Sequence, residues 1–210
     1  MVKRLGVDLG TTSIKVCIVD NESIVESVSI EHKADVTPML NNNECSHMFQ
    51  EQYPKIIIQR LNECFMSLKE TLEDVSEMSV CGQMHGVLLW KPKWTNIDVI
   101  KGGNVMEIYE HSVDVITNLI TWQDARCDEK FISCLPNSQS NCNVFSGYGC
   151  ASLIWLEQNH FDINQFTMCG TIMDFLVWLL TQTDCVQMTS HNANSWGYFD
   201  MMKDCWEMEM

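Results

Sequence analysis

The sequence predicts an α/β fold with a mixed sheet, and three observations support this prediction. Short apolar runs of the kind found in strands occupy residues 5–30. A helical repeat of apolar residues follows over 53–72, and beyond it strand-like runs alternate with helical repeats as far as residue 181. With 210 residues, the chain is long enough to bury one core of ordinary size, so we expect one domain or most of one.

The N-terminal part begins with strands and continues into a long helix. Three strands are expected, over 5–9, 14–19 and 24–30. Consecutive strands of this kind suit an antiparallel start to the sheet, and a polar loop over 31–50 follows them. Pro54 fits the first turn of the helix over 53–72, because proline lacks an N–H that this turn would leave unpaired. The core-facing stripe of this helix consists of Ile57, Leu61, Phe65, Leu68 and Leu72.

The rest of the chain alternates strands with helices. The expected strands are 78–81 and 87–90, and the expected helices are 151–158 and 172–181. Residues 113–122 are expected to return to the core and to end in a strand. Residues 91–112 are polar and contain Gly102-Gly103, so we interpret them as an insertion or loop. Asp124 stands where a helix would begin, and its carboxylate would cap the free N–H groups of the first turn. Another loop is expected over 136–146.

Composition and charge exclude several classes of partner. The formal net charge is −15, from 28 acidic and 13 basic residues, which argues against nucleic acid or an anionic membrane as a main partner. We expect no membrane span and no signal peptide, because no long apolar stretch is present. The 11 cysteines include no Cys-x-x-Cys pair, so we expect no zinc site and mostly buried, reduced thiols in a cytoplasmic protein. A homo-oligomer is compatible with the sequence.

The most informative segment is Leu5–Asp20, LGVDLGTTSIKVCIVD, which predicts two strands joined by a tight polar turn. Gly10 lets the backbone turn sharply and approach a ligand closely. Three hydroxyls add donors for an anion, those of Thr11, Thr12 and Ser13. Asp8 ends the first strand, where a carboxylate suits a hydrated Mg²⁺ beside phosphate oxygens. The pattern predicts a turn that binds nucleotide phosphates, and the alternative is an ordinary hairpin with a polar turn.

A second informative segment is Cys81–Trp90, CGQMHGVLLW, in which two glycines bracket three residues after a predicted strand. Loops at strand ends are where α/β proteins place ligands. Gln83 offers a hydrogen-bond donor and an acceptor, and a neutral His85 offers one of each. Such groups suit a polyol, whose hydroxyls both donate and accept. The alternative is a strand-to-strand turn whose histidine bonds to the backbone.

These two segments, with three later ones in the same order, resemble the FGGY family of carbohydrate kinases. The later segments are Leu119–Cys127 (LITWQDARC), Ser146–Leu156 (SGYGCASLIWL) and Met188–Asp200 (MTSHNANSWGYFD). The resemblance covers nearly the whole chain and implies an actin-like ATPase (ribonuclease H-like) fold. Two positions depart from the family pattern, since Ser152 stands near the place of a lysine and Ser190 replaces an acid.

The resemblance implies a site for ATP, Mg²⁺ and a ketose. The family contacts nucleotide phosphates at the positions of Gly10, Thr11, Thr12, Ser13 and Lys15, and Asp8 falls near the metal, which it holds through water. The family lines its sugar site at the positions of Gln83, Met84, His85 and Asp124. Alternatives exist for three positions. Lys15 would be a solvated side chain on the strand face, and Asp124 and Arg126, near the cleft, would form a helix cap and a structural ion pair. We interpret Trp122 as a core residue.

The resemblance also implies which sugar is phosphorylated and which parts of the family's enzyme lie beyond residue 210. The sequences of the five segments most resemble the branch of the family that phosphorylates the seven-carbon ketose sedoheptulose to its 7-phosphate. The alternative is a kinase for another ketose, such as xylulose. The general base of the family is an Asp beyond residue 210, and its second, nucleotide-binding domain lies further still. We therefore interpret residues 1–210 as an N-terminal domain that is incomplete at its C-terminal end and inactive alone. A short non-catalytic protein that binds sugar or phosphate is the other hypothesis.

Overall fold

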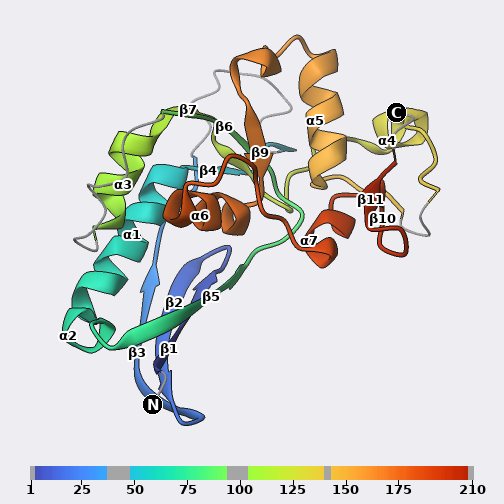
Figure 1. The fold of residues 1–210 in the computed structure, drawn as a ribbon. Helices are drawn as coiled ribbons and strands as arrows, with labels where there is room; N and C mark the ends of the chain where they lie inside the picture. Colours follow the sequence, from blue (N-terminus) through green and yellow to red (C-terminus); the bar gives the residue numbers. More distant parts are fainter. Residues whose placement is uncertain (1–2, 37–47, 94–103, 140–142, 208–210) are drawn as a thin grey trace.

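The computed structural model describes residues 3–36, 48–93, 104–139 and 143–207, and it confirms the α/β prediction. Figure 1 shows a sheet at the foot of the molecule, helices packed on it, and a second layered region toward the C-terminal end. The N-terminus lies at the foot of the sheet, whereas the chain ends on the far side of the molecule beside α4 (Glu129–Cys134).

The N-terminal sheet has four strands in the order β3-β2-β1-β5. Their bounds are Lys3–Leu9 for β1, Ser13–Asp20 for β2, Ser23–Glu31 for β3 and Val75–Gly82 for β5. The first three strands are antiparallel, as predicted, whereas β5 runs parallel to β1. Because β1 and β5 are parallel, the turn after Leu9 and the loop after Gly82 emerge at the same end of the sheet.

One face of this sheet is covered and carries the main core. Alternate residues of β1 and β2 point into it, as the strand period requires: Leu5, Val7, Leu9, Ile14, Val16 and Ile18. They pack with α1 (Pro54–Ser67) and α6 (Ile172–Thr181). The opposite face carries small and polar residues such as Gly6, Cys17 and Ser79 around an open hollow of about 500 Å³.

The predicted helix over 53–72 is present but divided at Leu68. Helix α1 ends at Ser67, and α2 (Lys69–Leu72) adds one more turn. The Leu68 N–H bonds the Phe65 carbonyl at 3.1 Å, three residues back, and its backbone leaves the helical region at φ −102 and ψ 10. Apolar periodicity continues through this break because the Leu68 side chain stays buried.

The prediction that residues 91–112 form a loop is wrong for their second half. Helix α3 (Val105–Ser112) begins at Asn104, whose side chain accepts the N–H groups of Met106 and Glu107. Val105, Ile108 and Tyr109 have the i, i+3, i+4 spacing of a helix and are buried against the core. The polar composition of the wider segment hid this short repeat. Residues 94–103 lie outside the described residues.

A second sheet has three antiparallel strands in the order β7-β6-β9. Their bounds are Val113–Ile116 for β7, Leu88–Pro92 for β6 and Met168–Gly170 for β9. Leu88 and Trp90 of β6 belong to the main core, whereas Leu89 belongs to a second cluster with residues of α5 (Gly149–Gln158) and Trp196. Strand β6 therefore contributes one face to each of the two hydrophobic clusters.

Short elements complete the molecule. Strands β4 (Glu51–Gln52) and β8 (Leu119–Ile120) pair, as do β10 (Phe199–Asp200) and β11 (Cys205–Trp206). The remaining pieces are the 3₁₀ helix Ile163–Gln165 and α7 (Ser190–Asn194). The strand expected toward the end of 113–122 corresponds to β8, and the same stretch begins with β7. Among the described residues, no helix combines the length and the apolar character that a membrane span needs.

The prediction that Asp124 caps a helix is also wrong. The following helix, α4, begins at Glu129, and its N-cap lies four residues after Asp124: the carboxylate of Asp128 accepts the Phe131 N–H at 2.7 Å. Asp124 instead lies buried before that turn, where its carboxylate bonds other partners. Two aspartates within one turn of each other satisfy the same sequence pattern, and only one of them has extended backbone directly before the helix.

Candidate functional site

The turn between β1 and β2 is tight and well braced. The Gly10 N–H donates to the Ser13 carbonyl at 3.0 Å, and a Cβ on Gly10 would lie 2.9 Å from that oxygen. Buried His32 supports the turn twice, since its N–H donates to the Thr12 carbonyl and its Nε2 bonds the Gly10 carbonyl. Its Nδ1 accepts the Ala34 N–H, which leaves Nε2 as the protonated nitrogen. The backbone of the predicted phosphate turn is therefore fixed before any ligand arrives.

Asp8 and Lys15 face each other on the open side of the sheet. The Lys15 Nζ lies 3.7 Å from the Asp8 carboxylate, and the side chains of Lys15 and Asp8 are 64% and 40% exposed. An ion pair this exposed adds little stability and leaves both groups available to a ligand. A single accessible carboxylate beside a phosphate turn fits Mg²⁺, which keeps several waters and needs only one or two carboxylates. Among the described residues, no cluster of three or more His, Cys, Asp or Glu side chains could hold a metal by itself.

The loop after β5 presents Gln83, Met84 and His85 in different ways. Gln83 is buried, whereas Met84 is 37% exposed. The His85 Nδ1 donates to the Ser195 carbonyl at 2.7 Å, and its ring stacks on Tyr148 with centroids 4.5 Å apart. The alternative prediction, that the histidine of this loop bonds to the backbone, is therefore correct for one of its two ring nitrogens, Nδ1. In the neutral ring with its proton on Nδ1, Nε2 has a lone pair that can accept a hydrogen bond from a hydroxyl.

The backbone of His85 is held in an unusual conformation. Its φ is +68°, in the left-handed region that residues with a Cβ adopt uncommonly. The bond to Ser195 and the stack on Tyr148 hold the ring from two sides. Such over-determined strain is typical of functional loops.

The turn and the loop are joined by one backbone hydrogen bond and by the side chain of Gln52. The Gln83 N–H donates to the Leu9 carbonyl at 2.9 Å, at the point where β1 enters the turn. The Gln83 side chain bonds Gln52, whose own amide donates to the Thr11 carbonyl at 2.7 Å. The side chain of Gln52 thus connects the segment predicted to bind phosphate with the segment predicted to bind the sugar.

Trp122 also belongs to this site, and its interpretation as a core residue is wrong. Its side chain is 46% exposed, and its indole N–H donates to the Thr11 hydroxyl at 2.9 Å. Its carbonyl is approached so closely by Gly147, at φ +79°, that a Cβ there would lie 2.2 Å from it. An aromatic ring with a polar edge suits such a half-exposed position.

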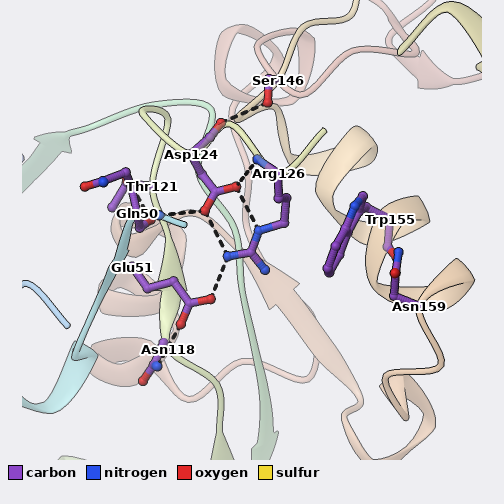
Figure 2. A network of polar contacts seen from close by, with 9 residues as sticks. All are labelled: Gln50, Glu51, Asn118, Thr121, Asp124, Arg126, Ser146, Trp155 and Asn159. Atoms are coloured by element: carbon purple, nitrogen blue, oxygen red, sulfur yellow. Dashed lines mark hydrogen bonds and ion pairs between the residues drawn. The ribbon is translucent and has the colours of Figure 1, made fainter. Parts of the chain in front are cut away.

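Asp124 and Arg126 form a buried ion-pair cluster (Figure 2). Each Asp124 carboxylate oxygen accepts two hydrogen bonds: Oδ1 from the backbone N–H and Nε of Arg126, and Oδ2 from the Gln50 N–H and the Arg126 Nη2. A carboxylate has about four acceptor sites, so these bonds use all of them. The structural ion pair foreseen for these residues is present. Neither carboxylate oxygen of Asp124 is left for a ligand. Asp124 would therefore contribute to a site by positioning its loop.

Arg126 is held on every side. Its guanidinium bonds Glu51 at 2.6 Å and lies over the rings of Phe49 and Trp155, with 4.8 and 5.4 Å to their centroids. Burial by itself lowers the pKa of this guanidinium, but the hydrogen bonds and charges of Asp124 and Glu51 outweigh burial and raise the pKa. The cluster ties the segment 49–51 to the segment 124–126, beside the turn and the loop.

Several residues of this site were missed by the sequence reasoning. Gln52, His32 and Tyr148 each contact one of the predicted ligand segments. Tyr148 lies within a segment that the resemblance had singled out. His32 comes from the stretch 31–50, which was interpreted as a loop, and Gln52 lies between that stretch and the predicted helix. No spacing signal marks them, because their roles depend on contacts between distant parts of the chain.

The sequence profile of the "FGGY family of carbohydrate kinases, N-terminal domain" matches residues 4–210 of this chain. Sedoheptulokinase from Homo sapiens is 32% identical over 98% of this chain and 44% of its own length, and that from Mus musculus is 33% identical over 98% and 43%. A xylulose kinase from Staphylococcus epidermidis is 26% identical over 87% of this chain and 34% of its own. The chain thus spans less than half the length of the curated relatives it matches.

Solved structures show the same fold. Xylulose kinase from Lactobacillus acidophilus, solved with a ligand bound, superposes over 100% of this chain and 39% of its own, with a TM-score of 0.70 at 18% identity. Plasmodium falciparum glycerol kinase with ADP superposes over 100% of this chain and 40% of its own, with a TM-score of 0.73 at 19% identity. At such identities the likeness concerns the fold alone, and it confirms the actin-like ATPase fold.

Proposed function

This chain belongs to the FGGY family of carbohydrate kinases, and we propose that it is the N-terminal domain of an ATP-dependent sedoheptulokinase. The proposed reaction transfers the γ-phosphoryl group of ATP to the 7-hydroxyl of sedoheptulose. A bond forms between the hydroxyl oxygen and phosphorus, and the bond from phosphorus to ADP breaks. The identity of 32–33% to two sedoheptulokinases supports this substrate over others.

The observation that carries the proposal is the junction of the two ligand segments. The turn at Gly10–Ser13 and the loop at Gln83–His85 emerge at the same end of parallel strands and are joined through Gln52. Phosphoryl transfer needs the phosphate and the accepting hydroxyl within reach of each other. A chain of this family that holds both segments side by side is suited to that task.

Each segment has a proposed role. The hydroxyls of Thr11, Thr12 and Ser13 would contact the phosphates, Gly10 would let the backbone approach them closely, and Lys15 would add a positive charge. Asp8 would hold Mg²⁺ through water, and the bound ion would neutralise charge on the phosphates. On the sugar side, His85 Nε2 and Gln83 would meet hydroxyls and Met84 would contact the carbon chain, while Asp124 would position the wall of the site.

The chain does not carry the whole reaction in this proposal. The hydroxyl proton needs a general base, and the resemblance places the family's base beyond residue 210. The length of the relatives and the uncovered face of the N-terminal sheet support an incomplete domain that a longer polypeptide would complete. We propose a cytoplasmic enzyme in which a second domain, absent here, closes over the site.

The first test compares this chain with the polypeptide of native length. We expect ADP release with ATP, Mg²⁺ and sedoheptulose only from the native-length protein, whose intact mass should be more than twice 24.2 kDa. Asp8→Asn should lower kcat in that protein by about a hundredfold or more, because the metal loses its protein anchor. Turnover by residues 1–210 alone would contradict the proposal that the base lies outside them.

The second test concerns the substrate. The kcat/KM for sedoheptulose should exceed that for xylulose and glycerol in the native-length protein. If the sugar with the highest kcat/KM had fewer than seven carbons, the sedoheptulose assignment would be wrong, whereas the assignment as a carbohydrate kinase would stand. A native polypeptide of 24.2 kDa that binds sugar without turnover would instead support a non-catalytic binding protein.

A further inference from the structure

Gln52 lies at the centre of a buried chain of side-chain amides. It is 1% exposed, and its Nε2 donates to the Thr11 carbonyl at 2.7 Å and to the Asp35 carboxylate at 2.9 Å. Both partners are acceptors only, so this end of the amide must be the NH₂ group. The orientation of Gln52 is therefore determined by Asp35 and Thr11.

The orientation of Gln83 follows from that of Gln52. The Gln52 oxygen is turned toward Gln83, whose Nε2 donates to it at 3.0 Å. The other end of the Gln83 amide must then be its oxygen, and this oxygen is buried without a hydrogen-bond partner among the described residues. Gln83 as a whole is 8% exposed. A buried acceptor without a donor costs free energy, and a ligand that brings a donor regains it.

We propose that Gln52 is a positioning residue, which holds the Gln83 amide so that its oxygen accepts a hydrogen bond from a hydroxyl of the sugar. The inference rests on the proposed function, because it assigns the unpaired oxygen to the sugar of the same site. Asp35 sets the amide of Gln52, Gln52 sets that of Gln83, and Gln83 selects a donor. The same relay fixes the Thr11 carbonyl, so the phosphate turn and the sugar loop share one support.

A double-mutant cycle on the sugar KM of the native-length enzyme tests the relay. Gln83→Met and Gln52→Met should each raise the KM for sedoheptulose about tenfold or more, because each removes the oriented acceptor. The double variant should be no worse than Gln83→Met alone, because Gln52 acts on the sugar only through Gln83. The proposal would be overturned if the increases in sugar KM from the two single variants multiplied in the double variant. An unchanged sugar KM in Gln83→Met would also overturn it.

Gln50→Met is the matched control on the same segment, since the Gln50 side chain is exposed and only its backbone bonds the site. Its sugar KM should stay within about twofold of the wild type, as expected for an exposed substitution. An effect as large as that of Gln52→Met would assign the change to the segment and overturn the role of Gln52.

Gln52→Glu provides a second variant with a distinct signature. Between the Thr11 carbonyl and the Asp35 carboxylate, the new carboxyl group can donate only when it is protonated, so the relay should return as the pH falls. The ratio of the variant's sugar KM to that of the wild type should fall at least severalfold from pH 8 to pH 6. A ratio independent of pH would contradict the relay. Failure of the wild type to use any ketose would instead overturn the proposed function.

Discussion

Single side chains at this site act through fixed partners. The Asp124 carboxylate, the Arg126 guanidinium and the Gln52 amide are buried, and each makes at least two hydrogen bonds, of which at least one goes to a distant segment. Buried polar groups of this kind tolerate no loss of a partner, because the remaining charge or dipole cannot return to water. The same property makes them effective at holding neighbouring residues in place.

At the residue scale, Arg126→Ala should lower the free energy of unfolding by about 3–5 kcal/mol, because it leaves the Asp124 carboxylate buried without its cation. The measurement is urea unfolding followed by circular dichroism. Arg4→Ala removes an arginine from the exposed pair with Glu77 and should cost less than about 1 kcal/mol. Equal losses in the two variants would show that the buried cluster has no special role in stability.

Elements of this chain are held at their ends as well as along their faces. The N-terminus of α6 carries a capping box, in which Thr171 and Asp174 each bond the backbone of the other. Asn192 of α7 adds bonds to the Thr171 hydroxyl and the Asp174 carboxylate. Burial raises the pKa of Asp174, although the bonds from Thr171 and Asn192 oppose this effect. One cap therefore joins α6 to the following helix, α7.

At the element scale, Thr171→Ala should lower the free energy of unfolding by about 1–2 kcal/mol, because α6 loses its cap and Asn192 loses a partner. Thr171→Ser keeps the hydroxyl and should retain most of the stability. Thermal unfolding of the three proteins checks both expectations. If the serine variant were as unstable as the alanine variant, lost packing of the threonine methyl rather than the cap would be responsible.

In the whole molecule, two hydrophobic clusters meet at strand β6. Leu88 and Trp90 face the main cluster, which contains Cys64, and Leu89 faces the second cluster, which contains Cys150. Burial raises the pKa of Cys64 to about 11 and that of Cys150 to about 12. The prediction of mostly buried thiols is wrong for the described residues, since Cys64, Cys127 and Cys150 are buried whereas Cys81, Cys134, Cys185 and Cys205 are exposed.

At this scale we expect the two clusters to unfold together, because β6 cannot leave one without exposing the other. Iodoacetamide at pH 8 should label Cys134 and Cys185 in the folded protein, whereas Cys64 and Cys150 stay protected as buried thiols. In rising urea, Cys64 and Cys150 should become reactive at the same concentration, as peptide mass spectrometry would show. Labelling of Cys150 at clearly lower urea would make the second cluster a separate folding unit.

Local patterns in the sequence were sufficient to predict a large part of the fold. The strands β1 and β2, the helix α6, the tight turn at Gly10 and the α/β class all follow from apolar periodicity and turn chemistry. The ordered motifs also identified the family, which the profile over residues 4–210 confirms. These features depend on residues close together in the chain, so a linear reading is enough.

Which residues meet became visible only in three dimensions. In the folded chain Asp128 rather than Asp124 caps a helix, Trp122 lies at the surface beside Thr11, and residues 105–112 form a helix with one buried face. It also joins Gln52 to Thr11 and Gln83, which are 41 and 31 residues away. The physical reason is that hydrogen bonds and burial depend on distance in space rather than on distance along the chain. The parallel pairing of β1 with β5 brings together residues that no periodic pattern in the sequence predicts to be neighbours.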